Sequence, residues 1–418
     1  MIPQTLGIDF GTSNTAAGLM VAGKPHLIEV EPGKTTLPTS LFFDTSRKVT
    51  SYGSAANAAL IDGREGRFMR ALKSVLGTPL MRERRQIAYE QLTLIEAVAR
   101  FLRTVRERAE SGTGLQFRHA VSGRPVLFHS SNPERNAQAQ IDLAEAYALA
   151  GFETVTFLPE PEAAALAAGG AEDGSLGLIV DIGGGTSDFS IFERADEGIR
   201  VIASNGVRVG GTDFDKAISL AHIMPLLGRG APIRNDMGPG TYTAPNTIFN
   251  DLASWEKIPF LYAPDTRRTA ALFKKMAVDP SLFKRLHDTL ELELGHDLAF
   301  AVEQGKIQIN RPEIADAGID LRVLENGLWA RVSEDSLTDV LADHAAKIGD
   351  CANATLAMAD IPASRIGTVV FVGGSSLMHV VRDAMVTLFP HAKLEQAEAF
   401  TAVANGLAMA AEKADAQR

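Results

Sequence analysis

The sequence predicts an α/β protein of two related domains, and three observations support this prediction. The chain has 418 residues, which is more than one hydrophobic core usually serves. Two short glycine-rich stretches far apart in the chain resemble each other, GIDFGTS at residues 7–13 and VDIGGGTS at residues 180–187. A third glycine turn, in TVVFVGGSS at residues 368–376, leaves an apolar strand and precedes a helical pattern from about Met378 to Leu388.

The first glycine stretch predicts a hairpin of two strands. An apolar run, Leu6–Phe10, precedes the turn, and a second strand-like run, Thr15–Val21, follows it. Glycine lets a backbone approach a ligand closely, and the exposed N–H groups of such a turn form an anion-binding nest. The hydroxyls of Thr12 and Ser13 would add donors, and Asp9 can hold a hydrated Mg²⁺ through its waters.

The second stretch predicts the same arrangement, with Leu178–Ile182 before the turn, Phe189–Phe192 after it and Asp181 in the place of Asp9. One such motif alone also fits a β-hairpin turn whose aspartates serve solubility. Two of them in one chain favour a pair of turns that face each other across a cleft. We therefore expect the two hairpins to clamp the phosphates of one nucleotide from opposite sides.

Two other stretches have a predictable local structure. The pattern IEAVARFLRTVRERA at residues 95–109 predicts an amphipathic helix whose apolar face points inward. The stretch 229–247 is rich in Pro, Gly and Asn and predicts a long loop, which is either functional or an insertion peculiar to this chain.

Composition and missing motifs exclude several classes. There is no GxxxxGK[ST] phosphate loop, no GxGxxG that opens a helix, and no HExxH among the nine histidines. The net charge of −10 argues against nucleic acid as an obligatory partner. Arg82, Arg84 and Arg85 lie close together in the sequence, and we expect a solvated helix face there, with a local basic patch as the alternative. A single cysteine, Cys351, excludes an internal disulfide and fits a reducing compartment. With no signal-peptide pattern and no apolar run long enough to span a membrane, we expect a cytoplasmic location and no membrane partner.

Seven ordered segments together resemble the nucleotide-binding domain of DnaK-type, or heat-shock-70, chaperones in the actin-like ATPase superfamily. These segments are GIDFGTSNT (7–15), GKTTLPTSLFF with YGSAANAAL (33–43 and 52–60), FMRALKSVLG (68–77), FLPEPEAAALAAG (157–169), VDIGGGTSDFSIF (180–192), RVGGTDFDKAI with FVGGSS (208–218 and 371–376), and AVANGLAMAA (402–411).

The resemblance implies a duplicated actin-like (ribonuclease H-like) fold with two lobes around a nucleotide cleft. The first domain would cover residues 1–175, with a helical cap lobe at about 45–110. The second would cover 176–418, with a cap lobe at about 215–310. Its C-terminal helix, 396–415, would return to the hinge.

The resemblance also implies the site and its cofactors, ATP or ADP with Mg²⁺. Asp9 and Asp181 would organise the metal through water. Lys73 would reach the γ-phosphate, while Glu160, or its neighbour Glu162, would orient the attacking water near Asp188. The remaining nucleotide contacts are Gly11, Thr12, Ser13, Asn14, Gly183, Gly184, Gly185, Thr186, Gly210, Gly211, Glu303, Lys306, Gly373, Gly374 and Ser375.

The chain departs from the family pattern at the base end of this site. Ile307 and Leu377 stand where the family carries arginines beside the adenine, and Phe400 stands where it carries an acidic residue. Loss of two stacked guanidinium groups, each contributing about 0.5–2 kcal/mol, predicts weaker or differently selective base binding.

The function that the resemblance implies is that of a slow, Mg²⁺-dependent ATPase of the chaperone type whose lobes open and close with nucleotide state. Because little follows the closing helix, the chain resembles short members of the family that lack the substrate-binding domain. A protein client or co-chaperone would be its partner. Three alternatives stay open: a small-molecule kinase of the same superfamily, a nucleotide-gated assembly protein, and a sensor that binds nucleotide without turnover.

Overall fold

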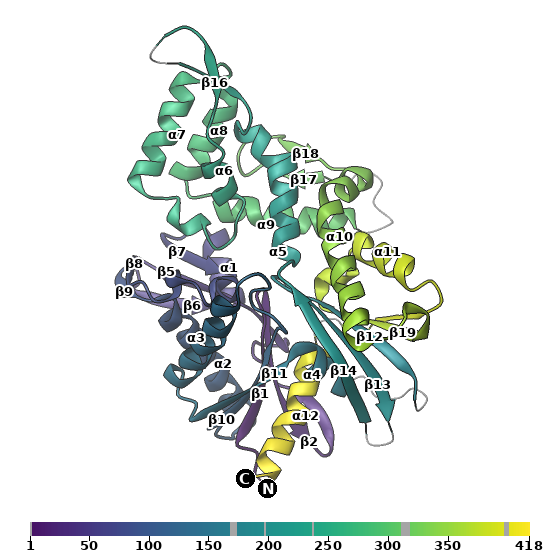
Figure 1. Cartoon of the computed structure of the whole chain (residues 1–418). Coiled ribbons are helices and arrows are strands. Elements are labelled where there is room, and N and C mark those ends of the chain that lie inside the picture. Colours follow the sequence, from purple (N-terminus) through teal and green to yellow (C-terminus); the bar gives the residue numbers. More distant parts are fainter. Residues whose placement is uncertain (1, 168–173, 196–197, 236–237, 311–317, 397–400) are drawn as a thin grey trace. The chain divides into compact units, whose positions relative to one another are not determined.

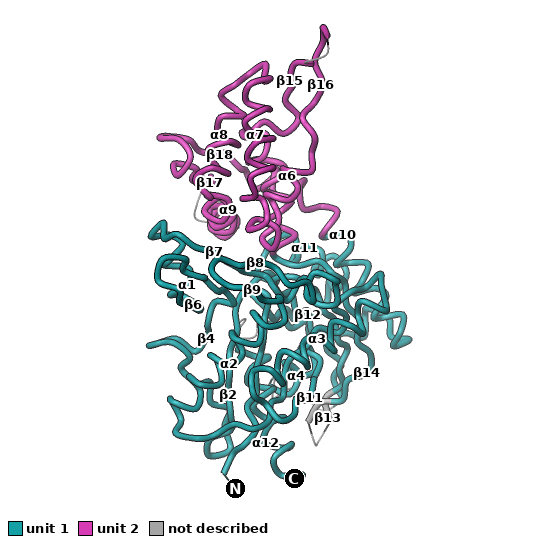
Figure 2. The backbone as a smooth tube through the Cα atoms, turned by 90° about the vertical axis from the view of Figure 1, so that its left-hand side faces the viewer, with its two compact units in different colours: residues 1–211, 345–418 teal, residues 212–344 magenta. Residues whose placement is uncertain are grey.

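The computed structural model describes residues 2–167, 174–195, 198–235, 238–310, 318–396 and 401–418. The chain divides into two compact units, which are described one at a time (Figure 2). Unit 1 comprises residues 1–211 and 345–418, and unit 2 comprises residues 212–344. The predicted domain boundary at residue 175 stays a prediction.

The first sheet of unit 1 has the strand order β11-β10-β1-β2-β3, with β4 paired to β2. Its strands β1, β2 and β3 form an antiparallel meander, and β10 and β11 continue from β1 in parallel. The first five residues of β1 alternate little in burial, because its apolar side chains are covered on both faces. The strands are β1 (Thr5–Phe10), β2 (Asn14–Val21), β3 (Lys24–Leu27), β4 (Thr36–Pro38), β10 (His119–Arg124) and β11 (Thr154–Pro159).

The second sheet repeats this topology. Its order is β14-β13-β12-β19-β20, in which β12, β13 and β14 form the antiparallel meander and β19 and β20 continue from β12 in parallel. The equivalence of β1 with β12 confirms the predicted duplication and the α/β class. The strands are β12 (Leu176–Ile182), β13 (Ser187–Ala195), β14 (Gly198–Val207), β19 (Ile366–Val372) and β20 (Lys393–Gln396).

Two helices join these sheets into one core, α4 (Glu160–Ala167) and α12 (Ala402–Ala416). Helix α12 packs on α4 and on β1 (Figure 1). Side chains from both sheets and both helices form one buried cluster that includes Val121, Ile179, Ala163 and Leu407. Helix α12 packs on β1 and helix α4 packs on β12, so the two helices together connect the strands that lead into the two glycine hairpins.

Close approach of α12 depends on two glycines. A Cβ atom on Gly406 would lie 1.7 Å from the carbonyl oxygen of Ala163 in α4. A Cβ atom on Gly7 in β1 would lie 2.6 Å from the backbone nitrogen of Ala408. The last turn of α12 is also tied to β1, because the Asp415 carboxylate accepts hydrogen bonds from the backbone N–H of Gln4 and Thr5.

Helix α2 (Leu94–Thr113) confirms the amphipathic helix predicted at residues 95–109. It begins with a capping box in which the Thr93 hydroxyl and the Glu96 carboxylate each accept the other residue's backbone N–H. The remaining elements of unit 1 are α1 (Ser54–Ile61), α3 (Pro133–Leu149) and α11 (His379–Leu388), the sheet β6-β5-β7 (Val49–Tyr52, Ser40–Asp44 and Gly66–Arg70) and the hairpin β8-β9 (Arg85–Ile87 and Glu90–Leu92).

Unit 2 is mainly helical, and its described residues bury Trp255, Phe249 and Phe283. Within the predicted loop 229–247, two three-residue strands form a small hairpin, β15 (Pro232–Arg234) with β16 (Thr241–Thr243). The helices are α5 (Gly211–Ile218), α6 (Thr247–Leu252), α7 (Pro264–Met276), α8 (Pro280–Glu291), α9 (Gly295–Ile309) and α10 (Glu334–Ala359), and a second hairpin pairs β17 (Gly318–Asp320) with β18 (Trp329–Arg331). Helix α5 starts at the last residue of unit 1, and α10 continues into unit 1.

In the described part of the chain, no helix combines the length and the apolar character that crossing a membrane requires.

Candidate functional site

The turn of the first hairpin is held by one backbone hydrogen bond. The N–H of Gly11 donates to the carbonyl of Asn14 over 3.0 Å. The turn is so tight that a Cβ atom on Gly11 would lie 2.3 Å from that carbonyl oxygen. The bond leaves Thr12 and Ser13 at the tip of the hairpin, with Thr12 buried and Ser13 partly buried.

The second hairpin has the same turn. The N–H of Gly183 donates to the carbonyl of Thr186 over 3.0 Å, with the same spacing of three residues. Gly184 and Gly185 occupy the tip, in the place of Thr12 and Ser13, and both are partly buried. The two stretches that resemble each other in sequence therefore share a hydrogen-bond pattern as well as a place in their sheets.

The tips of the two hairpins lie against each other. A Cβ atom on Gly184 would lie 2.6 Å from the Ser13 hydroxyl and 2.9 Å from the Cβ of Thr12. A Cβ atom on Gly185 would lie 3.2 Å from the hydroxyls of both Thr12 and Ser74. The glycines of the second hairpin are thus required by the approach of the first.

The other predicted glycine contacts gather around the second hairpin. A Cβ atom on Gly210 would lie 2.5 Å from the backbone nitrogen of Gly185, and the N–H of Gly211 donates to the carbonyl of Gly183. Gly373, with φ of +80°, lies close enough for a Cβ atom to reach 2.4 Å from the Ile182 carbonyl. Gly374 and Ser375 follow in a 3-10 turn, Gly374–Leu377.

A buried ion pair lies beside the hairpins. The Lys73 ammonium donates to the Glu160 carboxylate, with 2.6 Å between Nζ and Oε1. Burial opposes the charge on Lys73, but Glu160, Asp9 and Asp188 outweigh it and hold the pKa of Lys73 above its usual value. Of the two glutamates in the EPE stretch, Glu160 contacts Lys73, whereas burial raises the pKa of Glu162 against the influence of Arg124.

Three aspartates around this ion pair have raised pKa values. Burial and the nearby Glu160 carboxylate raise the pKa of Asp9 to about 7. The same two causes raise the pKa of Asp188 to about 8, although Asp188 accepts a 2.6 Å hydrogen bond from the backbone N–H of Val126. Burial, together with Glu160 and the other two aspartates, also raises the pKa of Asp181. Four carboxyl groups thus lie near one ammonium, and the site carries an excess of negative charge whenever more than one of them is ionised.

This charge excess fits a divalent cation. Asp9 and Asp181 occupy equivalent strand positions just before the two turns, and Mg²⁺ prefers carboxylate oxygens together with water and phosphate. Among the described residues, no three His, Cys, Asp or Glu side chains are grouped as direct ligands of one metal ion.

Two features of this site escaped the sequence reasoning. Ser74 directly follows Lys73, and its buried hydroxyl has no hydrogen-bond partner among the described residues. Asp188 was expected beside the attacking water, but it also joins the second hairpin to the segment after β10 through Val126. The position of Ser74 directly after the candidate Lys73 was the sequence signal that could have identified it as a site residue.

The two residues predicted to contact adenosine lie on α9 in unit 2. Lys306 is buried and forms an ion pair with Asp215 of α5, with 2.7 Å between Nζ and Oδ1. The Trp255 indole donates to the other Asp215 oxygen over 3.3 Å. Burial raises the pKa of Asp215, while Lys306 acts in the opposite direction. Glu303 is partly buried and lies near enough to raise that pKa further.

The Lys306–Asp215 pair predicts a strong effect on stability. Lys306→Met leaves Asp215 as a buried, uncompensated carboxylate, so we expect unit 2 to lose about 3–5 kcal/mol. The double variant Lys306→Met with Asp215→Leu should recover a large part of this loss. Urea unfolding followed by Trp255 fluorescence measures both, with the exposed Lys275→Met as control. A Lys306→Met protein as stable as the wild type would contradict this interpretation.

Two of the residues that depart from the family pattern are exposed apolar side chains. Ile307 on α9 is 41% exposed, and Leu377 after the third glycine turn is 37% exposed. Phe400, the third departure from the family pattern, lies outside the described residues.

The duplicated sheets and the paired glycine hairpins are consistent with the fold of the actin-like ATPase class. The family model described as "Hsp70 protein" matches residues 5–230, which is more than half of the chain. The chain belongs to the Hsp70 family. This membership supports an ATP-binding protein of the chaperone type.

One relative is the chaperone protein DnaK of Thermoplasma acidophilum. It is 32% identical over 222 residues, which are 51% of this chain. The chain spans 34% of the length of that relative, so the activity and partners of the whole DnaK protein are not transferred by this match.

Proposed function

We propose that the protein binds ATP and ADP and slowly hydrolyses ATP with Mg²⁺. The observation that carries this proposal is the meeting of two turns with the same hydrogen-bond pattern, at Gly184 and Thr12, beside the buried Lys73–Glu160 pair. Backbone N–H groups and hydroxyls at the tips of facing turns suit the oxygens of a polyphosphate. A charged lysine and a carboxylate beside them suit the transfer of its terminal phosphoryl group to water.

The phosphate contacts in this proposal come from both hairpins and their neighbours. Thr12, Ser13 and the Gly183–Thr186 turn would donate to the β- and γ-phosphates, and the Ser74 hydroxyl would add a donor from the lysine side. Gly210 and Gly373 would act mainly by letting the second hairpin keep its shape, because side chains there would collide with its backbone. Gly211 would support the same turn through its N–H, which donates to the Gly183 carbonyl.

Catalysis would rest on Lys73 and Glu160. The Lys73 ammonium would offset the negative charge of the γ-phosphate, and its raised pKa keeps it charged at neutral pH. Glu160 would accept a hydrogen bond from the attacking water and orient it. Asp188 would support this arrangement from the second hairpin.

Asp9 and Asp181 would hold Mg²⁺ through its water ligands. When bound, the ion supplies positive charge that offsets the phosphates and the surrounding carboxylates. The four carboxyl groups gathered around one ammonium support this assignment.

The residues at the predicted adenosine contacts support a selectivity for the nucleotide base that differs from that of the family. In unit 2, Lys306 forms an ion pair with Asp215 and Ile307 is an exposed apolar side chain. In unit 1, Leu377 is an exposed apolar side chain, so neither position supplies the guanidinium group that the family carries there. We expect the phosphates to contribute more of the binding energy than the base, and therefore a small difference in affinity between ATP and GTP.

Calorimetry with ATP, ADP and GTP, with and without Mg²⁺, tests the binding proposal, and phosphate release in a single turnover tests hydrolysis. The expected results are Mg²⁺-dependent binding of ATP and slow release of phosphate. No binding of any nucleotide would overturn the proposal. Binding without turnover would favour the second candidate, a nucleotide sensor, which the altered base end supports.

The same experiments separate the remaining functions. Transfer of phosphate to a metabolite would favour a small-molecule kinase, and ATP-dependent sedimentation would favour an assembly protein. Likeness to DnaK supports opening and closing of the lobes with nucleotide state and a protein client or co-chaperone as partner. Small-angle scattering with ATP and with ADP measures the opening and closing of the lobes.

A further inference from the structure

The segment that carries Lys73 has a backbone that needs support. This segment, residues 71–82, is called the lysine loop; it contains two 3-10 turns, Leu72–Val75 and Pro79–Met81. Ala71 has φ of +61° and Gly77 has φ of +78°, so both adopt the left-handed conformation. For alanine this conformation is unfavourable, and it persists only where surrounding contacts impose it.

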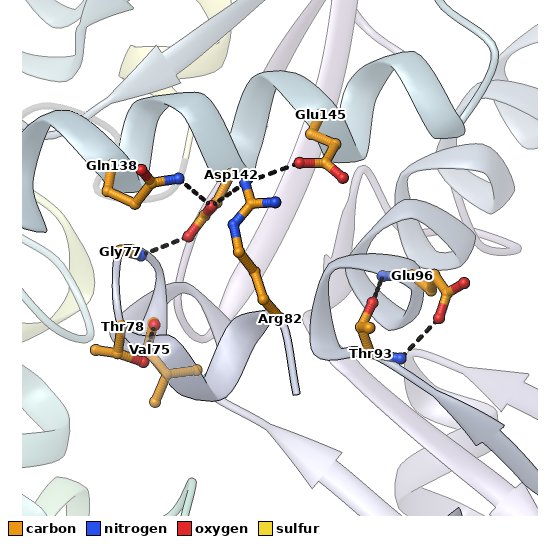
Figure 3. Close-up of polar contacts among 9 residues, drawn as sticks. All are labelled: Val75, Gly77, Thr78, Arg82, Thr93, Glu96, Gln138, Asp142 and Glu145. Atoms are coloured by element: carbon orange, nitrogen blue, oxygen red, sulfur yellow. Dashed lines mark hydrogen bonds and ion pairs between the residues drawn. The ribbon is translucent and has the colours of Figure 1, made fainter. Parts of the chain in front are cut away.

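Helix α3 supplies such contacts through one carboxylate (Figure 3). One oxygen of Asp142 accepts a 2.9 Å hydrogen bond from the backbone N–H of Gly77. The other oxygen accepts from the side chains of Arg82 and Gln138, each over 2.8 Å. Two of these three donors belong to the lysine loop, so Asp142 ties the loop to α3 at its middle and at its end.

The loop backbone lies directly on α3 at the same place. A Cβ atom on Gly77 would lie 2.1 Å from the carbonyl oxygen of Arg135 and 3.0 Å from the backbone nitrogen of Ala139. Arg82 also bonds Glu145, one turn along α3 from Asp142. Together these contacts leave Gly77 little freedom to move along the helix.

Two further contacts hold the loop backbone between Gly77 and Lys73. The His129 ring nitrogen Nε2 lies 2.7 Å from the carbonyl oxygen of Leu76. The Arg208 guanidinium donates to the carbonyl of Ser74 over 2.8 Å. Lys73 itself ends on Glu160. Between Lys73 and the Asp142 contact, the backbone of the lysine loop is thus held at Ser74, Leu76 and Gly77.

Packing alone does not explain an aspartate at position 142. It lies on the face of α3 that buries Ala139, Leu143 and Ala146, and its side chain is fully buried. An apolar side chain there would avoid the cost of burying a carboxylate. What the aspartate adds is a directed acceptor for the N–H of Gly77.

We propose that Asp142 is a positioning residue that sets the place of the Lys73 ammonium against Glu160 through the lysine loop. Its effect on hydrolysis rests on the proposed ATPase function, whereas its effect on Lys73 does not. Two measurements separate these parts.

The first measurement is the rate at which Lys73 reacts with acetic anhydride in the full chain without nucleotide, followed by mass spectrometry. In Asp142→Asn, whose amide cannot accept from all three donors, we expect Lys73 to react about five- to tenfold faster as its pairing with Glu160 loosens. The matched control is Glu145→Gln, which changes the other partner of Arg82 and should leave the rate unchanged.

Arg82→Ala removes the second of the two contacts between Asp142 and the lysine loop, from a side chain that is 47% exposed, and leaves the Gly77 contact in place. It tests the proposal if Asp142→Asn does not fold. A two- to threefold faster reaction is expected for it. An unchanged Lys73 reaction rate in the folded variants would overturn the proposal, whether or not the protein hydrolyses ATP.

The second measurement is single-turnover hydrolysis. Asp142→Asn should lower kcat about tenfold with little change in KM or in the Kd for ADP, because small displacements of a catalytic group are costly while the hairpins stay intact. Combining Asp142→Asn with Lys73→Ala should be no slower than Lys73→Ala alone. Additive losses would point to a general structural role and overturn the proposal. A wild type without turnover would instead refute the ATPase function, and the first measurement would still decide the role of Asp142.

Discussion

Glu160→Gln is expected to lower the rate of ATP hydrolysis by about 10²–10³-fold while leaving the fold almost as stable as before. The amide keeps the size of the side chain, but its neutral oxygen accepts a weaker hydrogen bond than a carboxylate and would orient the attacking water less well. Lys73 loses one partner but keeps the influence of Asp9 and Asp188, so its charge stays compensated. Nucleotide affinity should therefore change little.

Lys73→Met should have a different result, with activity and stability lost together. Without the ammonium, four carboxyl groups lie together, because Lys73 is the cation that lowers the pKa values of Asp9, Asp181 and Asp188 among the described residues. Breaking a buried ion pair from one side costs about 3–5 kcal/mol. Added Mg²⁺ should restore part of this stability, since a divalent ion offsets the same charges.

Single-turnover phosphate release and urea unfolding, each with and without Mg²⁺, measure this asymmetry. Glu162→Gln provides the comparison between the two glutamates. If Glu162→Gln abolished hydrolysis while Glu160→Gln retained it, the roles of the two residues would be reversed. Equal loss of stability in Glu160→Gln and Lys73→Met would contradict the charge argument.

Gly406→Ala is expected to destabilise unit 1 by at least about 3 kcal/mol, which is unusual for adding one methyl group. The new Cβ atom would lie 1.7 Å from the carbonyl oxygen of Ala163, a backbone atom that no side-chain rotation can move. Helices α4 and α12 would have to separate. Because α4 begins at Glu160, the change should also impair the site.

Gly349→Ala is the matched control for this substitution. Gly349 also lies within a helix, α10, but a Cβ atom there would only touch Leu388 at 3.7 Å. Alanine in a helix interior is favoured over glycine by about 0.5–1 kcal/mol, so this variant should be slightly more stable than the wild type. Thermal and urea unfolding of both variants measure the contrast. Wild-type stability in Gly406→Ala would mean that the two helices do not pack as closely as the structure shows.

The sequence was sufficient for features that depend on local pattern. Apolar runs interrupted by glycine predict the strands β1 and β12 and their turns, and helical spacing predicts α2. The duplication could be predicted because residue types at a tight turn are restricted, so both turns keep a recognisable sequence.

Contacts between distant side chains could not be predicted in the same way. The pairing of Lys306 with Asp215 depends on how α9 and α5 pack, and nothing in either segment alone specifies it. Asp142 left a weak signal, an acidic residue on an otherwise apolar face of α3, but the sequence did not indicate its partner. Gly77 becomes its partner only through the path of the lysine loop across the helix.

The order of strands in the second sheet has a consequence for biosynthesis. Strand β12 pairs on one side with β13, which follows it directly, and on the other side with β19, where Leu178 is opposite Val369. All of unit 2 is translated between these partners. On the ribosome, therefore, the strand that carries Asp181 has an unpaired edge until residues 366–372 have emerged, whereas the first sheet can be completed much earlier with β11. The two sheets and their glycine hairpins are alike in structure, but the chain can assemble them only one after the other.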